Sequence, residues 1–225
     1  MIHVRAFIFV ALLLCGVRIS GQSTQEWRDS LAKLNQAIAA NPKSTDLRLK
    51  KAAVNIQLNQ WEYAIEEYGN VLRIHPQNLA ALYYRAYAQT TLRQYGLAKA
   101  DYETFLQIAP INMEARLGLA NVLERMGRMT DANDELNRIV QMFPDSAVAY
   151  AARALFESSR KQFEPALYDW TEAIRLAPTN VDYVVSKVEL LLQLGRKSEA
   201  RRELNEAISR GEPRYALKEW LDRCR

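Results

Sequence analysis

Apolar residues recur with helical spacing along most of the chain after residue 22. In residues 23–40, Trp27, Leu31, Leu34 and Ile38 lie three or four residues apart, which predicts an amphipathic helix with one buried face. Comparable runs follow, and several end just before a proline. Proline cannot continue a helix, so each one marks a helix end and a turn into the next helix. These prolines are Pro42, Pro76, Pro110, Pro144 and Pro178.

The five prolines are 34 residues apart each time, which is the signature of a repeat architecture. A repeat that starts three residues after each proline gives the units 45–78, 79–112, 113–146, 147–180 and 181–214. Two helices approach closely only where side chains are small, so a recurring alanine predicts a helix crossing, with large residues filling the space beside it. Position eight is small or apolar (Ala52, Ala86, Ala120, Ala154, Val188) and position twenty is always alanine (Ala64, Ala98, Ala132, Ala166, Ala200). Position twenty-four is large (Tyr68, Tyr102, Leu136, Trp170, Leu204).

These residues resemble the tetratricopeptide repeat, a helix–turn–helix with an Ala-x3-Phe motif and a closing proline. Ala64-x3-Tyr68, Ala98-x3-Tyr102 and Ala166-x3-Trp170 match that motif. The Trp and Gly of the family's first helix are mostly missing, and the last repeat has Pro213 one residue late. The resemblance implies an all-α fold, a right-handed superhelical solenoid of stacked helix pairs that presents a concave, peptide-binding groove.

Both ends of the array fit a capping role. Residues 22–44 predict one leading helix. Residues 215–225 predict a closing helix, and the stretch 214–223 places Tyr215, Leu217, Trp220 and Leu221 among charges. With ten paired helices this makes about twelve.

Residues 1–21 have the form of a secretory signal peptide: Arg5, then an apolar run from Ala6 to Leu14 that is too short to span a bilayer, then small and polar residues. We expect cleavage after Gly21 and export, most simply to a periplasm; secretion is the alternative. Cys15 follows three leucines as in a bacterial lipobox, although Leu14 is large for that motif. Lipidation of Cys15 would anchor the protein to the envelope, and membrane association is expected only in that case.

Charge and composition exclude several functions. Residues 1–21 contain two arginines and no acid, so their removal lowers the net charge from +4 to +2 and weakens the case for a nucleic-acid partner. The sequence contains two His and two Cys, with no glycine-rich phosphate loop and no metal-ligand spacing. We therefore expect no enzyme, no cofactor, no metal and no small-molecule substrate. Cys224, the one cysteine after the leader, is expected to be an unused thiol; an intermolecular crosslink is the alternative.

A base at position seven and an acid at position twenty-three recur in four repeats and predict a salt bridge between the two helices. The third repeat has Leu119 and Glu135 instead. Recurrence indicates a structural pair and argues against a catalytic acid/base couple. The four pairs are Lys51–Glu67, Arg85–Asp101, Arg153–Asp169 and Lys187–Glu203.

The concave wall is expected at positions two, five, nine, twelve and thirteen of each first helix, and it is fairly apolar. Positions five and nine of the first two repeats lack the Lys and Asn by which some relatives clamp a C-terminal carboxylate. Exposed apolar surface of this kind marks a binding face; the alternative is that superhelical curvature buries it as core. The candidate binding residues are Leu49, Tyr83, Tyr87, Leu117, Asn121, Glu124, Arg125 and Leu155.

The sequence thus predicts an exported, non-catalytic adaptor that binds a protein or peptide partner in this groove. Two alternatives remain: a self-associating or lipid-anchored envelope scaffold, and a holdase for exported chains.

Overall fold

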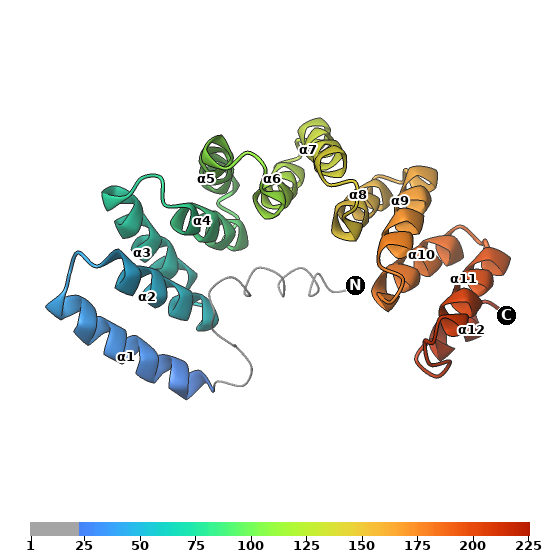
Figure 1. Ribbon diagram of the computed structural model, residues 1–225, viewed down its shortest axis with the longest axis horizontal. Helices are drawn as coiled ribbons and strands as arrows, with labels where there is room; N and C mark the ends of the chain where they lie inside the picture. The colour runs from blue at the N-terminus through green and yellow to red at the C-terminus, as the bar shows by residue number, and fades with distance from the viewer. Residues whose placement is uncertain (1–22) are drawn as a thin grey trace. The chain divides into compact units, whose positions relative to one another are not determined.

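The computed structural model describes residues 23–225, and all regular structure in that range is helical (Figure 1). The expected all-α fold with twelve helices is confirmed over these residues. The signal peptide, its cleavage site and Cys15 lie outside the described residues. The helices are α1 (Thr24–Ala40), α2 (Thr45–Gln57), α3 (Trp61–Ile74), α4 (Leu79–Thr91), α5 (Tyr95–Ile108), α6 (Met113–Arg125), α7 (Met129–Met142), α8 (Ala147–Ser159), α9 (Phe163–Leu176), α10 (Val181–Gln193), α11 (Lys197–Ser209) and α12 (Lys218–Arg223).

The chain forms two compact units, which are described separately. The first ends at Arg128 and contains α1–α6; the second begins at Met129 and contains α7–α12. In each unit, helices adjacent in the chain pack on one another, as with α2 and α3 or α8 and α9. The boundary falls inside the third repeat, which is the one whose sequence lacks the base–acid pair.

Every first helix of a repeat begins directly after a capping Ser or Asn, which in four of the five cases is the last residue of the repeat before it. Such a side chain satisfies one of the backbone N–H groups that have no partner inside the helix. Asn78 Oδ1, for example, accepts a hydrogen bond from the Ala81 backbone N–H at 2.9 Å. The caps are Ser44, Asn78, Asn112, Ser146 and Asn180. The sequence-based prediction did not include these caps, although their residue type and their 34-residue spacing both indicate them.

The turn inside each repeat places position fifteen in the left-handed backbone region. Gly127 and Gly195 adopt it without a side-chain penalty, at φ of 76° and 72°. Asn59, Arg93 and Lys161 adopt it at 56°, 60° and 60°. In all five repeats the residue after it donates its N–H to the carbonyl of position eleven, which ends the first helix.

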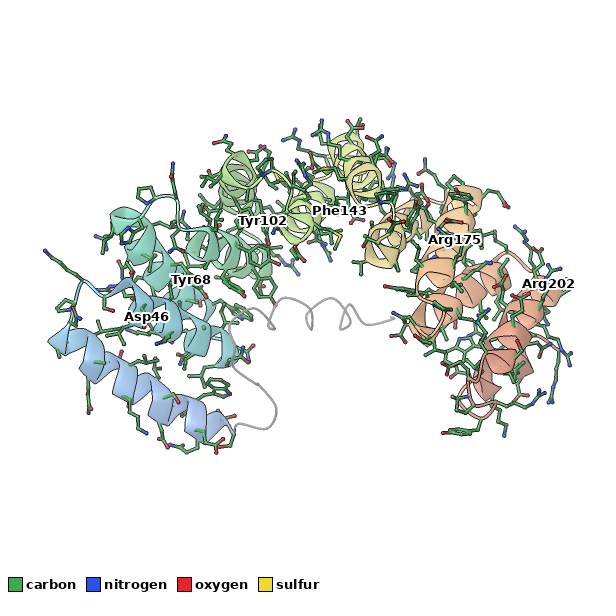
Figure 2. The ribbon with its side chains drawn as sticks, viewed as in Figure 1. Asp46, Tyr68, Tyr102, Phe143, Arg175 and Arg202 are labelled. Carbon is green, nitrogen blue, oxygen red and sulfur yellow. The ribbon has the colours of Figure 1, made fainter. Side chains whose placement is uncertain are left out.

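The core follows the alanine at position twenty and the large residue at position twenty-four. The alanine at position twenty is fully buried in all five repeats, and its large neighbour four residues later is at most 5% exposed. Tyr68 and Tyr102 therefore lie in the interior of the first unit (Figure 2), and Trp170 lies in the core of the second.

The C-terminal end is shorter than expected. Residues 214–217 form a turn, and α12 spans only Lys218–Arg223. Leu217 and Leu221 are buried as expected. Tyr215 is 82% exposed, so the prediction that it belongs to the apolar face of the closing helix is wrong. Glu189 of α10 holds α12 in place. It accepts hydrogen bonds from Trp220 Nε1 at 2.6 Å and from both terminal nitrogens of Arg223 at 2.5 and 2.7 Å.

Cys224 is a free thiol that packs into the core of the second unit, where burial raises its pKa. The buried position favours the unused thiol over an intermolecular crosslink.

Candidate functional site

All four predicted base–acid pairs form. Arg85 and Asp101 make two parallel hydrogen bonds of 2.7 and 2.6 Å, and Arg153 and Asp169 make two of 2.6 and 2.8 Å. Lys51 Nζ lies 2.8 Å from Glu67, which Arg48 also contacts at 2.7 Å. Lys187 Nζ lies 2.5 Å from Glu203.

These pairs connect the helices of a repeat. The Asp169 side chain is only 1% exposed, and those of Asp101 and Glu67 are 8% exposed. In the third repeat, Glu135 pairs within its own helix with Arg138. These acids are therefore more deeply buried than the acid of a surface ion pair, and their role is structural.

In the first unit, α4 lies beside both α2 and α6. These are the first helices of three successive repeats, and together they carry seven of the eight candidate residues. Leu49, Tyr83 and Leu117 occupy position five and are half-buried, whereas Asn121 and Arg125 of α6 are exposed. We call this surface the first-helix face; its candidate residues are Leu49, Tyr83, Tyr87, Leu117, Asn121, Glu124 and Arg125.

Tyr83 is shared between this face and the core. Its ring makes edge contacts with Tyr84, Tyr102 and Phe105, at centroid distances of 5.2, 5.9 and 6.1 Å. Burial, reinforced by Tyr84 and Glu114, raises the pKa of Tyr83 to about 12. Its hydroxyl is therefore neutral at physiological pH, and replacing Tyr83 would disturb packing as well as the surface.

Tyr87 keeps more of its ring at the surface. Its edge meets Trp61 of α3 at a centroid distance of 5.9 Å, and burial raises its pKa too. Trp61 was not a candidate in the sequence, although it begins α3 with an amphipathic pattern. The exposed Ala53 of α2 occupies the same repeat position as Tyr87. The face thus presents apolar and aromatic area with polar groups on α6, a composition that suits protein recognition.

The remaining candidate, Leu155, lies on α8 of the second unit and is 47% exposed. Two other expected wall residues of that unit have structural roles: Ala151 is 3% exposed, and Glu189 is occupied by α12.

Neither a metal-binding group nor a membrane span is found between residues 23 and 225. No three His, Cys, Asp or Glu side chains there are grouped to hold a metal ion. None of the helices in that range is long and apolar enough to cross a bilayer.

Comparison with known families matches the repeat pattern. Two tetratricopeptide repeat models match the chain, one over residues 23–78 and the other over residues 91–156, and together they cover more than half of it. The chain belongs to the tetratricopeptide repeat family. Proteins of this family generally act as non-catalytic interaction modules that bind protein or peptide partners.

Solved tetratricopeptide repeat proteins share the fold. A tetratricopeptide repeat protein from Parabacteroides merdae is similar with a TM-score of 0.66 and 21% identity, over 89% of this chain and 78% of that one. MamA from Desulfovibrio magneticus is similar with a TM-score of 0.62 and 18% identity, over 73% of this chain and 93% of that one. YrrB, described as having an unusual peptide-binding site, is similar with a TM-score of 0.56 and 19% identity, over 78% of this chain and 91% of that one.

One curated relative shares a shorter segment. Protein NPGR2 of Arabidopsis thaliana is 31% identical over 80 residues, which are 36% of this chain and 11% of that protein. The chain therefore spans about a tenth of the length of that relative.

Proposed function

We propose that this tetratricopeptide repeat protein is an exported adaptor that binds a partner peptide or helix on the first-helix face of its first unit. The observation that supports this most strongly is the side-by-side packing of α2, α4 and α6, which places Leu49, Tyr87 and Leu117 on neighbouring helices with their side chains only half-buried. Persistent apolar surface of this kind marks a binding site.

The test uses residues whose replacement leaves the core intact. Ala53 lies exposed on α2, so Ala53→Arg adds bulk and charge to the face. Ala100 lies exposed on α5, the second helix of its repeat, and Ala100→Arg makes the same change away from the face. Both tagged variants are crosslinked in the native cell envelope, and the captured proteins are identified by mass spectrometry.

We expect one dominant partner that is retained by Ala100→Arg and lost by Ala53→Arg. Equal loss or equal retention in both variants would contradict binding at this face. Many weak partners would favour a holdase, and recovery of the protein alone would favour self-association.

Export is proposed from the form of residues 1–21. The intact mass of the protein from its native cell is expected to match a chain that begins at Gln22. A mass that retains residues 1–21 contradicts cleavage, and a chain that begins at a lipidated Cys15 supports the anchored scaffold.

A further inference from the structure

Helix α1 has the register of a second helix, and no first helix of its repeat lies among residues 23–225. With the 34-residue period extended toward the N-terminus, Ser30 takes the crossing position of Ala64, Leu34 takes that of Tyr68, and Pro42 closes the helix as Pro76 does. Trp27 then matches Trp61, the first residue of α3. The register of α1 is thus that of α3, α5, α7, α9 and α11.

The apolar stripe of α1 is not covered as it is in those helices. In all five repeats the residues at positions twenty and twenty-four are at most 5% exposed. The matching residues of α1, Ser30 and Leu34, are only half-buried, and α1 contains no buried residue. The difference lies in the neighbours: α3, α5, α9 and α11 each pack on the first helix of their own repeat, whereas among residues 23–225 α1 packs on α2.

The sequence before α1 does not fit the missing position. The same period assigns residues 11–22 to the first helix of the repeat that contains α1. Arg18 would then stand at position eight, the helix crossing, where the five repeats have Ala or Val. A long charged side chain there would hold two helices apart. These residues lie outside the described part of the chain.

The charge on α1 is reversed relative to the repeats. All five have an acid at position twenty-three, and in four of them it pairs with a base from the first helix. The matching residue of α1 is Lys33, which is exposed and makes no ion pair within residues 23–225. A helix that completes the repeat would therefore place its position-seven residue near a positive charge.

We propose that the α1 stripe (Trp27, Ser30, Leu34, Ile38) docks an amphipathic helix of a partner protein, with an acidic residue followed by a small one at its centre. The small residue would meet Ser30 at the crossing, and the acid would pair with Lys33. A second copy of this chain fits poorly. Its first helices have Lys or Arg at the matching position in four repeats and Leu119 in the fifth, so none supplies an acid.

A peptide of known sequence tests the charge rule. The probe is a labelled, end-capped peptide with the sequence of residues 146–160, which contains α8 and its capping serine and is rich in alanine, a strong helix former. One version keeps Arg153 and the other has Arg153→Glu. Binding of each to the full chain is followed by fluorescence anisotropy.

The Arg153→Glu peptide is expected to bind about two- to fivefold tighter than the Arg153 peptide, the effect of one partly exposed ion pair. Lys33→Glu in the full chain should reverse that preference. Lys218→Glu in α12 makes the same charge change elsewhere and should leave it unaltered. Leu34→Asp should abolish binding of both peptides, and the fold of the variant is checked by circular dichroism.

Four results would overturn the proposal. Equal binding of the two peptides, or a preference that Lys33→Glu does not alter, would place the peptide elsewhere. No binding by the full chain would mean that α1 is already covered by residues 1–22. A dimer in sedimentation that Leu34→Asp dissociates would identify a second copy as the occupant.

Discussion

Single side chains in neighbouring repeats are fitted closely to one another. The buried Tyr102 ring of α5 lies against Gly118 of α6, where a Cβ atom would come within 2.7 Å of Tyr102 Cε1 and its hydroxyl oxygen. Tyr102 also meets the edge of Tyr83. The ring therefore has little room to retreat, and the glycine is required by packing.

Gly118→Ala should destabilise the first unit by about 1–3 kcal/mol, because the overlap with Tyr102 outweighs the helix propensity gained from alanine. Gly69→Ala in α3 is the matched control: its Cβ would meet only Arg85 at 3.8 Å, so propensity should stabilise that variant. Thermal unfolding of the two variants measures the difference. A Gly118→Ala variant as stable as Gly69→Ala would contradict the close fit.

Position eleven has buried polar residues in three repeats. Asn55, Gln89 and Glu157 are at most 9% exposed, and each has a side-chain atom with no hydrogen-bond partner among the described residues. Leu123 and Leu191 fill the same position in the other two repeats. Burial, with the nearby Asp169, raises the pKa of Glu157 to about 7, and Arg153 opposes that rise.

Glu157→Leu should stabilise the second unit at pH 8. The pKa of Glu157 is higher in the folded chain than in the unfolded one, whose value is near 4.5, so folding holds this proton more tightly. Stability from this group is therefore complete below pH 4.5 and is lost as the pH rises through 7. The variant should remove that loss, about 1–3 kcal/mol. Urea midpoints at pH 5 and pH 8 test this: the gap between them should narrow in Glu157→Leu, and an unchanged gap would contradict the assignment.

Some features of single residues could be predicted from the sequence, and others could not. The core was predictable because an alanine at position twenty and a large residue at position twenty-four recur in every repeat. Gly118 and the polar residues at position eleven differ between repeats, so periodicity carries no signal for them. Tyr83 was expected on a binding wall, and only the structure shows that its ring also contacts Tyr102 and Phe105.

Pairs of helices are joined by the recurring base–acid bridge as well as by apolar packing. A buried ion pair adds little to the stability of the fold compared with an apolar pair of similar size. Removal of one partner, however, leaves a buried charge uncompensated. Arg85→Leu would leave Asp101, whose side chain is 8% exposed, in that state. The third repeat shows that a leucine at this position is tolerated, since Leu119 replaces the base.

Arg85→Leu should destabilise the first unit by about 3 kcal/mol, and Arg85→Leu/Asp101→Leu should recover most of that loss. Lys50→Leu, which removes the exposed partner of Asp46, should cost less than about 0.5 kcal/mol. Denaturant midpoints of the three variants form the test. A double variant no more stable than Arg85→Leu would show that the pair itself contributes the stability.

Helix ends were the least predictable feature at the scale of elements. Proline and period located the ends of the second helices, because proline in a helix interior removes a backbone hydrogen bond and clashes with the preceding turn. Pro213 marked the end of the last repeat, but nothing in the sequence marked where the closing helix begins, and its apolar spacing extended through Tyr215. In the structure Leu217, and not Tyr215, is the residue that packs into the core.

At the scale of the molecule, repeats interact mainly with their neighbours, and the chain forms two compact units. Stability in such an array is a sum of local contributions, and a single two-state transition is not expected. The sequence predicted one wall across five repeats, with Leu155 among its residues. Seven of the eight candidates lie in the first unit, and no sequence pattern marked the boundary at Arg128 apart from the missing base in the third repeat.

Leu204→Ala should loosen the second unit selectively. Leu204 is fully buried in α11, so the truncation should cost about 2–5 kcal/mol of local stability. Hydrogen exchange read by mass spectrometry should become faster in α9–α12 and stay unchanged in α2–α5. Faster exchange throughout the chain would show that the two units unfold together.

The capping residue that stands directly before every repeat has a consequence for changes in chain length. Deleting residues 79–112 would join Asn78 directly to Met113, and Asn78 would then stand before α6 in the place of Asn112, whose side chain caps the Ala115 backbone N–H. A deletion one residue shorter or longer would separate the cap from its helix and shift the alanine crossing. Gene rearrangements can therefore shorten or lengthen this array in whole 34-residue steps, while other insertions and deletions are confined to the turns.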